Sequence, residues 1–116
     1  MLPASHRLKH DKDFERVFKT GRWTSGGLVT IKYAKRVNGD QPKMGFMVGS
    51  KVSKSSAKRN LVKRRMREVV RLLNKKGKIS GDFDIIFIAK QEILGKTYHE
   101  IEEDIKFALN GVKILR

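Results

Sequence analysis

Residues 55–74 read S-S-A-K-R-N-L-V-K-R-R-M-R-E-V-V-R-L-L-N, and this stretch predicts a helix with two distinct faces. The apolar face must pack on another element, and its members recur at helical spacing: Val62, Met66, Val69, Val70 and Leu73. A polar and mostly basic row covers another arc of roughly 140°: Arg59, Asn60, Lys63, Arg64, Arg67 and Arg71. Ser55 or Ser56 is expected to cap the helix by accepting a hydrogen bond from a backbone N–H.

Such a concentration of like charge on one helix calls for a partner of opposite charge. Like-charged side chains four residues apart destabilise an isolated helix by roughly a few tenths of a kcal/mol per pair, and Glu68 is the only acidic residue of residues 55–74. A solubilising helix face is the plainer interpretation. However, arginine predominates over lysine, and its planar fork suits bidentate phosphate contacts. Asn60 also stands inside the basic row. The pattern therefore favours a polyanion as the partner.

The chain as a whole is strongly basic. Its 116 residues include 27 Lys and Arg against 12 Asp and Glu, which gives a net charge of +15. A charge of this size points to nucleic acid or to an anionic membrane surface. No apolar run approaches the ~20 residues of a membrane span, and residues 1–7 show no signal peptide. We therefore expect a single domain over residues 1–116, located in the cytoplasm and without a membrane partner.

Residues 11–19 predict a short helix that ends before Gly21. Phe14, Val17 and Phe18 lie at positions i, i+3 and i+4 on its apolar side. On the plainer interpretation all three belong to the core. On the alternative, an aromatic ring stays accessible for stacking on an unpaired base, a contact that contributes roughly 1–3 kcal/mol.

The next segments predict strands. Residues 22–24 are expected to form a short edge strand, and residues 28–35 a longer one. Alternation in the longer strand predicts two faces: Val29, Ile31 and Tyr33 on one, and Leu28, Thr30 and Lys32 on the other. Asn38-Gly39 signals a hairpin turn, so residues 44–48 are expected to form the returning strand. Residues 49–56 form a polar loop whose lysines suit phosphate contacts, although a mobile linker would have a similar sequence.

Residues 83–89 read F-D-I-I-F-I-A and predict a central strand covered on both faces. Because a helix precedes it, this strand is expected to pair in parallel with an earlier one. Asp82 and Asp84 are expected to be solvated at the entry of the strand.

Thr97 and Glu100 predict the capping box of a last helix that extends to about residue 110. Its expected buried stripe is apolar: Tyr98, Ile101, Ile105, Ala108 and Leu109. Its expected exposed side is acidic: Glu100, Glu102, Glu103 and Asp104. Since acidic groups repel a polyanion, this helix should lie away from the basic surface.

The sequence contains no pattern of a catalytic or metal site. Cysteine is absent, and His6, His10 and His99 lack the spacing of metal ligands. The carboxylates of the last helix do not show the convergence that a metal site or an acid–base pair requires. No glycine-rich phosphate loop follows a strand. These observations predict a binding protein whose own side chains cleave nothing.

Four motifs resemble those of the bacterial ribonuclease P protein family. Residues 59–67 match its pattern R-N-x-x-K-R-x-x-R, and residues 7–9 with 13–21 resemble R-L-K…D-F-x-x-V-F-K-x-G. Residues 45–52 resemble G-x-x-V-S-K-K-V, with Gly49 and Ser50 in place of the usual Ser-Lys. Residues 83–89 resemble the late D-[FY]-D-[IV]-[IV] strand. The order and spacing of the motifs agree over essentially the whole chain.

This resemblance implies a compact α+β fold in the order α-β-β-β-α-β-α, with a four-stranded sheet and a left-handed β-α-β crossover. It implies two partners, the catalytic RNA of ribonuclease P and precursor tRNA, with one protein per RNA and no DNA. The RNA would hydrolyse a phosphodiester bond and so free the 5′ end of tRNA. The Mg²⁺ needed for this reaction would be bound chiefly by the RNA. The protein would be a non-catalytic subunit that holds no metal tightly.

The resemblance also implies roles for particular residues. Those expected to face the catalytic RNA are Arg59, Asn60, Lys63, Arg64 and Arg67, and the wider RNA-binding set adds Lys51, Lys54, Lys58 and Arg71. Those expected to line a cleft for the 5′ leader are Phe14, Phe18, Thr30 and Lys32. Lys32 stands near a position where the family often has an aromatic residue, and could meet a leader phosphate. The alternatives are a structural ribosomal or general RNA-binding protein, and a sequence-specific DNA binder.

Overall fold

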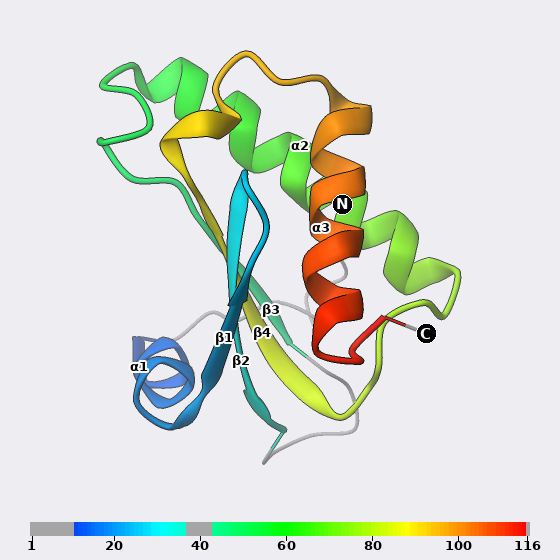
Figure 1. Ribbon diagram of the computed structural model, residues 1–116. Coiled ribbons are helices and arrows are strands. Elements are labelled where there is room, and N and C mark those ends of the chain that lie inside the picture. Colours follow the sequence, from blue (N-terminus) through cyan, green and yellow to red (C-terminus); the bar gives the residue numbers. More distant parts are fainter. Residues whose placement is uncertain (1–10, 37–42, 116) are drawn as a thin grey trace.

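The computed structural model describes residues 11–36 and 43–115 (Figure 1). Its elements follow in the order α1 (Asp11–Thr20), β1 (Arg22–Ser25), β2 (Val29–Lys35), β3 (Met44–Met47), α2 (Ser56–Lys75), β4 (Phe83–Ala89), the 3-10 turn η2 (Gln91–Ile93) and α3 (Tyr98–Gly111). The predicted α+β class and the order α-β-β-β-α-β-α are confirmed. The predicted hairpin turn and the motif at residues 7–9 lie outside the described residues. Within them, no helix is long and apolar enough to cross a membrane.

The four strands form one mixed sheet in the order β1-β2-β4-β3. β4 pairs antiparallel with β2 and parallel with β3, which confirms its predicted central position. The expectation that residues 44–48 return beside residues 28–35 is wrong, because β4 lies between these two strands. A strand as apolar as β4 gains most from neighbours on both edges and cover on both faces, and this favours its insertion over a local hairpin.

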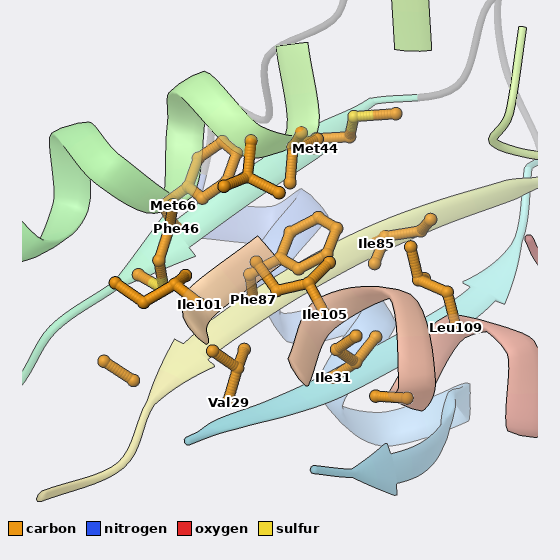
Figure 2. Close-up of a cluster of buried hydrophobic side chains, with 14 of the residues drawn as sticks. Val29, Ile31, Met44, Phe46, Met66, Ile85, Phe87, Ile101, Ile105 and Leu109 are labelled. Atoms are coloured by element: carbon orange, nitrogen blue, oxygen red, sulfur yellow. The ribbon is translucent and has the colours of Figure 1, made fainter. Parts of the chain in front are cut away.

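α2 and α3 cover one face of the sheet and form the main core with it (Figure 2). The predicted apolar stripe of α2 is buried throughout. The stripe of α3 is also buried, except that Tyr98 is half-buried. At the centre, the rings of Phe46 on β3 and Phe87 on β4 stack with their centroids 5.3 Å apart.

Both long helices begin at the residues that the sequence indicates. The Ser55 hydroxyl accepts a hydrogen bond from the N–H of Lys58, and Thr97 forms the full capping box with Glu100. Caps of this kind stabilise a helix by about 1 kcal/mol. After α2, Gly77 adopts a left-handed φ of 69°, a conformation that glycine reaches without steric cost.

α1 lies on the opposite face of the sheet from α3 (Figure 1). It packs there through a second, smaller cluster of buried residues, which comprises Val17, Ala34 and Ile86. Because this cluster is small, α1 covers only part of its face of the sheet.

Asp84 is buried, so the expectation that it is solvated is wrong. Its side chain forms an ion pair with the guanidinium of Arg16 on α1, and its other oxygen accepts the N–H of Lys43 at 2.9 Å. Arg16 also donates to the carbonyl of Lys35 at 3.1 Å. A buried carboxylate requires such partners, and these come from segments that are distant in the sequence. The ion pair therefore clamps α1 to the sheet. Asp82, in contrast, is exposed as predicted.

Asp104 is likewise not part of a solvated acidic side of α3. Its carboxylate accepts hydrogen bonds from the N–H groups of Gly27, Leu28 and Val29 at 2.7, 3.0 and 2.9 Å. A Cβ at Gly26 would lie 2.4 Å from the carboxylate oxygens, so any larger residue there would displace the Asp104 carboxylate. This anchored turn directs Leu28 toward the main core and not to the face of Thr30, where alternation had predicted it.

Replacement of the Asp84 carboxylate tests the clamp on α1. In Asp84→Ala, the guanidinium of Arg16 and the N–H of Lys43 lose their acceptor, and we expect the free energy of unfolding to fall by about 2–3 kcal/mol. Urea denaturation measures this change. Asp82→Asn, an exposed change two residues away, is the matched control and should be nearly neutral. Equal effects of both substitutions would contradict the clamp.

Candidate nucleic-acid interface

The polar row of α2 faces away from the core. Asn60 and Arg64 are exposed, while Arg59, Lys63 and Arg67 are half-buried. The guanidinium of Arg59 donates to the carbonyl of Ser53 at 2.9 Å. The guanidinium of Arg67 lies over the ring of Phe46, 5.7 Å from its centroid. Two arginines of the row are thus held in position by the protein, which reduces the entropy that they lose on binding an anion.

Arg71, also expected in this row, is already paired. Its Nε and Nη2 donate to the two carboxylate oxygens of Glu68 at 3.0 and 2.6 Å. This hydrogen-bonded pair lowers the pKa of Glu68 and raises the pKa of Arg71. An arginine that is already paired with a carboxylate binds a phosphate less strongly. We therefore expect Arg71 to contribute least to RNA binding among the residues of the predicted set. Arg65, outside that set, donates to the carbonyl of Lys96 at 2.9 Å.

The loop before α2 is anchored to the domain. Val52 is buried in the main core, and its N–H donates to the carbonyl of Gly49 at 3.0 Å. The predicted phosphate-binding lysines around this anchor, Lys51, Lys54 and Lys58, are all exposed. The loop therefore presents its cations from a defined backbone beside the first turn of α2, which a mobile linker would not do.

Phe14 and Phe18 are half-buried, so neither ring is sealed in the core. Both pack at the edge of the cluster formed by Val17, Ala34 and Ile86. The ammonium of Lys32 lies 5.3 Å from the centroid of the Phe18 ring, within the range of a cation–π contact. α1 and β2 thus bring an accessible aromatic edge and a cation together.

The register of the sheet defines the surface beside these rings. Directly paired residues project to the same face of a sheet. Thr30 pairs with Ile88, and Ile88 with Met47. The half-buried Thr30, Lys32 and Ile88 and the exposed Met47 therefore form a strip beside α1, which we call the open strip. Ile88 and Met47 were not predicted to belong to it, because their face depends on a strand order that the local sequence does not reveal.

The open strip leads toward the basic row of α2. Met47 is the last residue of β3, and the chain continues from it into the lysine-bearing loop and α2. In Figure 1, α2 begins at the upper left of the view, beyond the ends of β3 and β4, whereas α1 lies at the lower left and α3 lies across the sheet from α1. The open strip is therefore continuous along the chain with the loop and the start of α2 at one end of the sheet.

α3 brings three possible metal ligands together, although the carboxylates of this helix were expected not to converge. Ligand atoms of His99, Glu102 and Glu103 all lie within 4.8 Å of one another. The His99 side chain is 77% exposed, in agreement with a solvated histidine. Exposed acidic groups commonly adopt such spacing without an ion. Because α3 lies on the far side of the sheet, this group is separate from the open strip.

The fold and these surfaces define a small α+β domain with a basic helix near an aromatic-bearing sheet face, features typical of RNA-binding proteins. A family model described as Ribonuclease P matches residues 2–113. The chain therefore belongs to the ribonuclease P protein family, as its motifs had indicated, and is a protein component of an RNA-processing endoribonuclease.

Individual relatives agree with this assignment. The chain is 34% identical over 114 residues to the ribonuclease P protein component of Alkaliphilus metalliredigens, with 98% of this chain and 99% of the relative covered. It is 30% identical over 118 residues to that of a Synechococcus species, with coverages of 99% and 87%. The structure is similar to that of the Staphylococcus aureus RNase P protein, with a TM-score of 0.84, 26% identity and coverages of 96% and 98%.

The pairing of Arg71 with Glu68 predicts the effect of removing that carboxylate. Glu68→Gln should release Arg71 for a phosphate contact, and the slope of log K against log salt for RNA binding should then steepen by about 0.7–0.9. Titrations of the RNA at several salt concentrations measure this slope. Glu103→Gln on α3 makes the same change in net charge and should leave the slope unchanged. An equal change of this slope in both variants would mean that the net charge of the protein, and not the release of Arg71, sets the salt dependence of RNA binding.

Proposed function

We propose that this chain binds two RNAs within ribonuclease P. In this proposal, the polar row of α2 and the loop before it contact the catalytic RNA, and the open strip holds the 5′ leader of precursor tRNA. Family membership supports the general role in tRNA processing. The observation that carries the finer proposal is that the open strip ends at Met47, from which the chain continues into the lysine-bearing loop and the basic start of α2 beyond the end of the sheet (Figure 1).

The groups of the open strip suit single-stranded RNA. Unpaired bases offer free faces for stacking, and the accessible parts of Phe14 and Phe18 match them. The ammonium of Lys32 and the hydroxyl of Thr30 can meet phosphate and ribose groups between the bases. In a double helix the base faces are buried in the stack, so the strip should prefer an unpaired leader over the mature tRNA body.

The basic row suits the backbone of a folded RNA. Arg59 and Arg67 are positioned by Ser53 and Phe46, and Lys63 lies between them on the helix. Asn60 and Arg64 are free to reach ribose or phosphate groups. Contacts of this kind fix the orientation of a protein on an RNA and need no particular base sequence.

We assign the hydrolysis itself to the RNA and to Mg²⁺ bound chiefly by that RNA. The open strip presents aromatic, aliphatic, hydroxyl and ammonium groups, which bind RNA but are poor ligands for Mg²⁺. The Asp84 carboxylate, on the same face of the sheet, has both oxygens engaged by Arg16 and by the N–H of Lys43. We further propose that one protein binds one RNA and that this complex works in the cytoplasm.

Reconstitution with a bacterial ribonuclease P RNA tests this proposal. At low Mg²⁺, addition of the protein should increase the cleavage of precursor tRNA by that RNA. Phe14→Ala should weaken the binding of precursor tRNA to the complex by about 5- to 150-fold, the equivalent of one lost stacking contact, and should affect mature tRNA little. Binding titrations with both tRNAs at one fixed salt concentration measure the difference.

Phe107→Ala is the matched control, because Phe107 is an aromatic residue of α3 with 71% of its surface exposed. This substitution should change neither the affinity for precursor tRNA nor the affinity for mature tRNA. If Phe14→Ala weakened the binding of both tRNAs equally, the role of a general RNA-binding scaffold would explain the protein better. If the protein failed to stimulate cleavage at all, the assignment of the two binding surfaces would be wrong.

A further inference from the structure

Trp23 is the single tryptophan of the chain and stands on the edge strand β1 with 66% of its surface exposed. Neither buried cluster of the described residues includes it. Packing within the domain therefore does not account for an indole at this position, and its surroundings indicate what it could bind.

The register of β1 against β2 gives the side of the sheet to which Trp23 belongs. Trp23 pairs directly with Lys32 in the antiparallel ladder, and Lys32 pairs with Ile86. Paired residues project to the same face, with their Cβ atoms about 4.5–5.5 Å apart. The indole therefore lies on the side of the sheet that carries α1, next to the cation that approaches the ring of Phe18.

The aromatic groups thus occupy both sides of Lys32. Phe18 approaches it from α1, and Trp23 stands beside it on the outermost strand. Next along the strands, Ser25 pairs with Thr30, and their hydroxyl oxygens lie 3.5 Å apart. At the β1 edge of the sheet, the open strip therefore ends in the exposed indole of Trp23. The ammonium of Lys32 and the hydroxyls of Ser25 and Thr30 lie beside this indole.

We propose that Trp23 is a binding residue for RNA: its indole stacks on an unpaired base, while the ammonium of Lys32 contacts a phosphate next to that base. Indole offers the largest π-face among side chains, and stacking on aromatic side chains tolerates any base. This inference rests on the proposed function, since it extends the leader-binding surface across the sheet from α1 to its β1 edge.

Phe107 shows why exposure alone does not identify such a site. It is as exposed as Trp23, but it lies on α3, the helix that carries Glu100, Glu102 and Glu103. A phosphate chain near those carboxylates would be repelled. Trp23 differs in having Lys32 as its direct neighbour, so the two aromatics provide a natural comparison.

The full-length chain reports directly on this contact, because its intrinsic tryptophan fluorescence comes from Trp23 alone. Single-stranded oligoadenylate should quench this fluorescence as it binds, and binding should be followed independently by the anisotropy of a labelled oligonucleotide. Trp23→Leu should weaken the binding by about 5- to 150-fold, whereas Trp23→Phe should retain most of it, because only the latter keeps a stacking ring. Phe107→Leu should bind as the wild type does.

The melting temperature of each variant should equal that of the wild type, since Trp23 and Phe107 both bury little surface. Saturated binding with unchanged fluorescence, or equal affinities of the wild type and Trp23→Leu, would overturn the inference.

The same variants in the reconstituted complex separate this inference from the proposed function. If Phe14→Ala selectively weakens precursor tRNA and Trp23→Leu does not, the leader surface is correct and the role of Trp23 is wrong. If the wild-type complex shows no preference for precursor over mature tRNA, the leader surface itself fails, whatever the oligonucleotide result.

Discussion

The buried carboxylate of Asp84 joins α1, the end of β2 and the start of β3 at one point, through Arg16 and the N–H of Lys43. The other buried contacts of α1 with the sheet centre on Val17, a small area for fixing a helix. The ion pair sets where α1 lies along the sheet. Because α1 is held at this end, the face beyond Ile86 stays uncovered, and Thr30, Lys32 and Ile88 remain partly accessible. A surface that combines exposed apolar, hydroxyl and ammonium groups in this way is available for a partner to cover.

The distribution of charge directs that partner away from the exposed side of α3. The chain carries a net charge of +15, and its first three elements, the loop and α2 supply most of the cations, whereas α3 carries a group of carboxylates. Crowded cations repel one another along α2, and an RNA backbone relieves this repulsion when it binds. Arg59 and Arg67 are already positioned by other parts of the domain. The acidic helix α3 lies across the sheet from the open strip, and its carboxylates discourage RNA binding on its exposed side.

Local sequence patterns were sufficient to predict the helices, their caps and the buried stripes. Ser55, Thr97 and Glu100 act through neighbours within a few residues, so their roles can be read directly from the chain. Three features could not be predicted in this way: the insertion of β4 between β2 and β3, and the buried roles of Asp84 and Asp104. Each depends on partners that are far away in the sequence, such as Arg16 for Asp84 and the N–H groups of residues 27–29 for Asp104. For the same reason, the basic row could be predicted as a helix face, whereas the membership of Met47 and Ile88 in the open strip required the strand register.

The most direct measurement of a shared RNA-binding surface is a map of backbone amide chemical shifts as a single-stranded oligoribonucleotide is added to the full chain. A continuous surface predicts shifts along α1, in the strands at Thr30, Lys32 and Ile88, and in the loop and first turns of α2, with α3 unaffected. Shifts confined to α2, with the strands and α1 unchanged, would show that the basic helix binds RNA without the open strip and would contradict this view of the molecule.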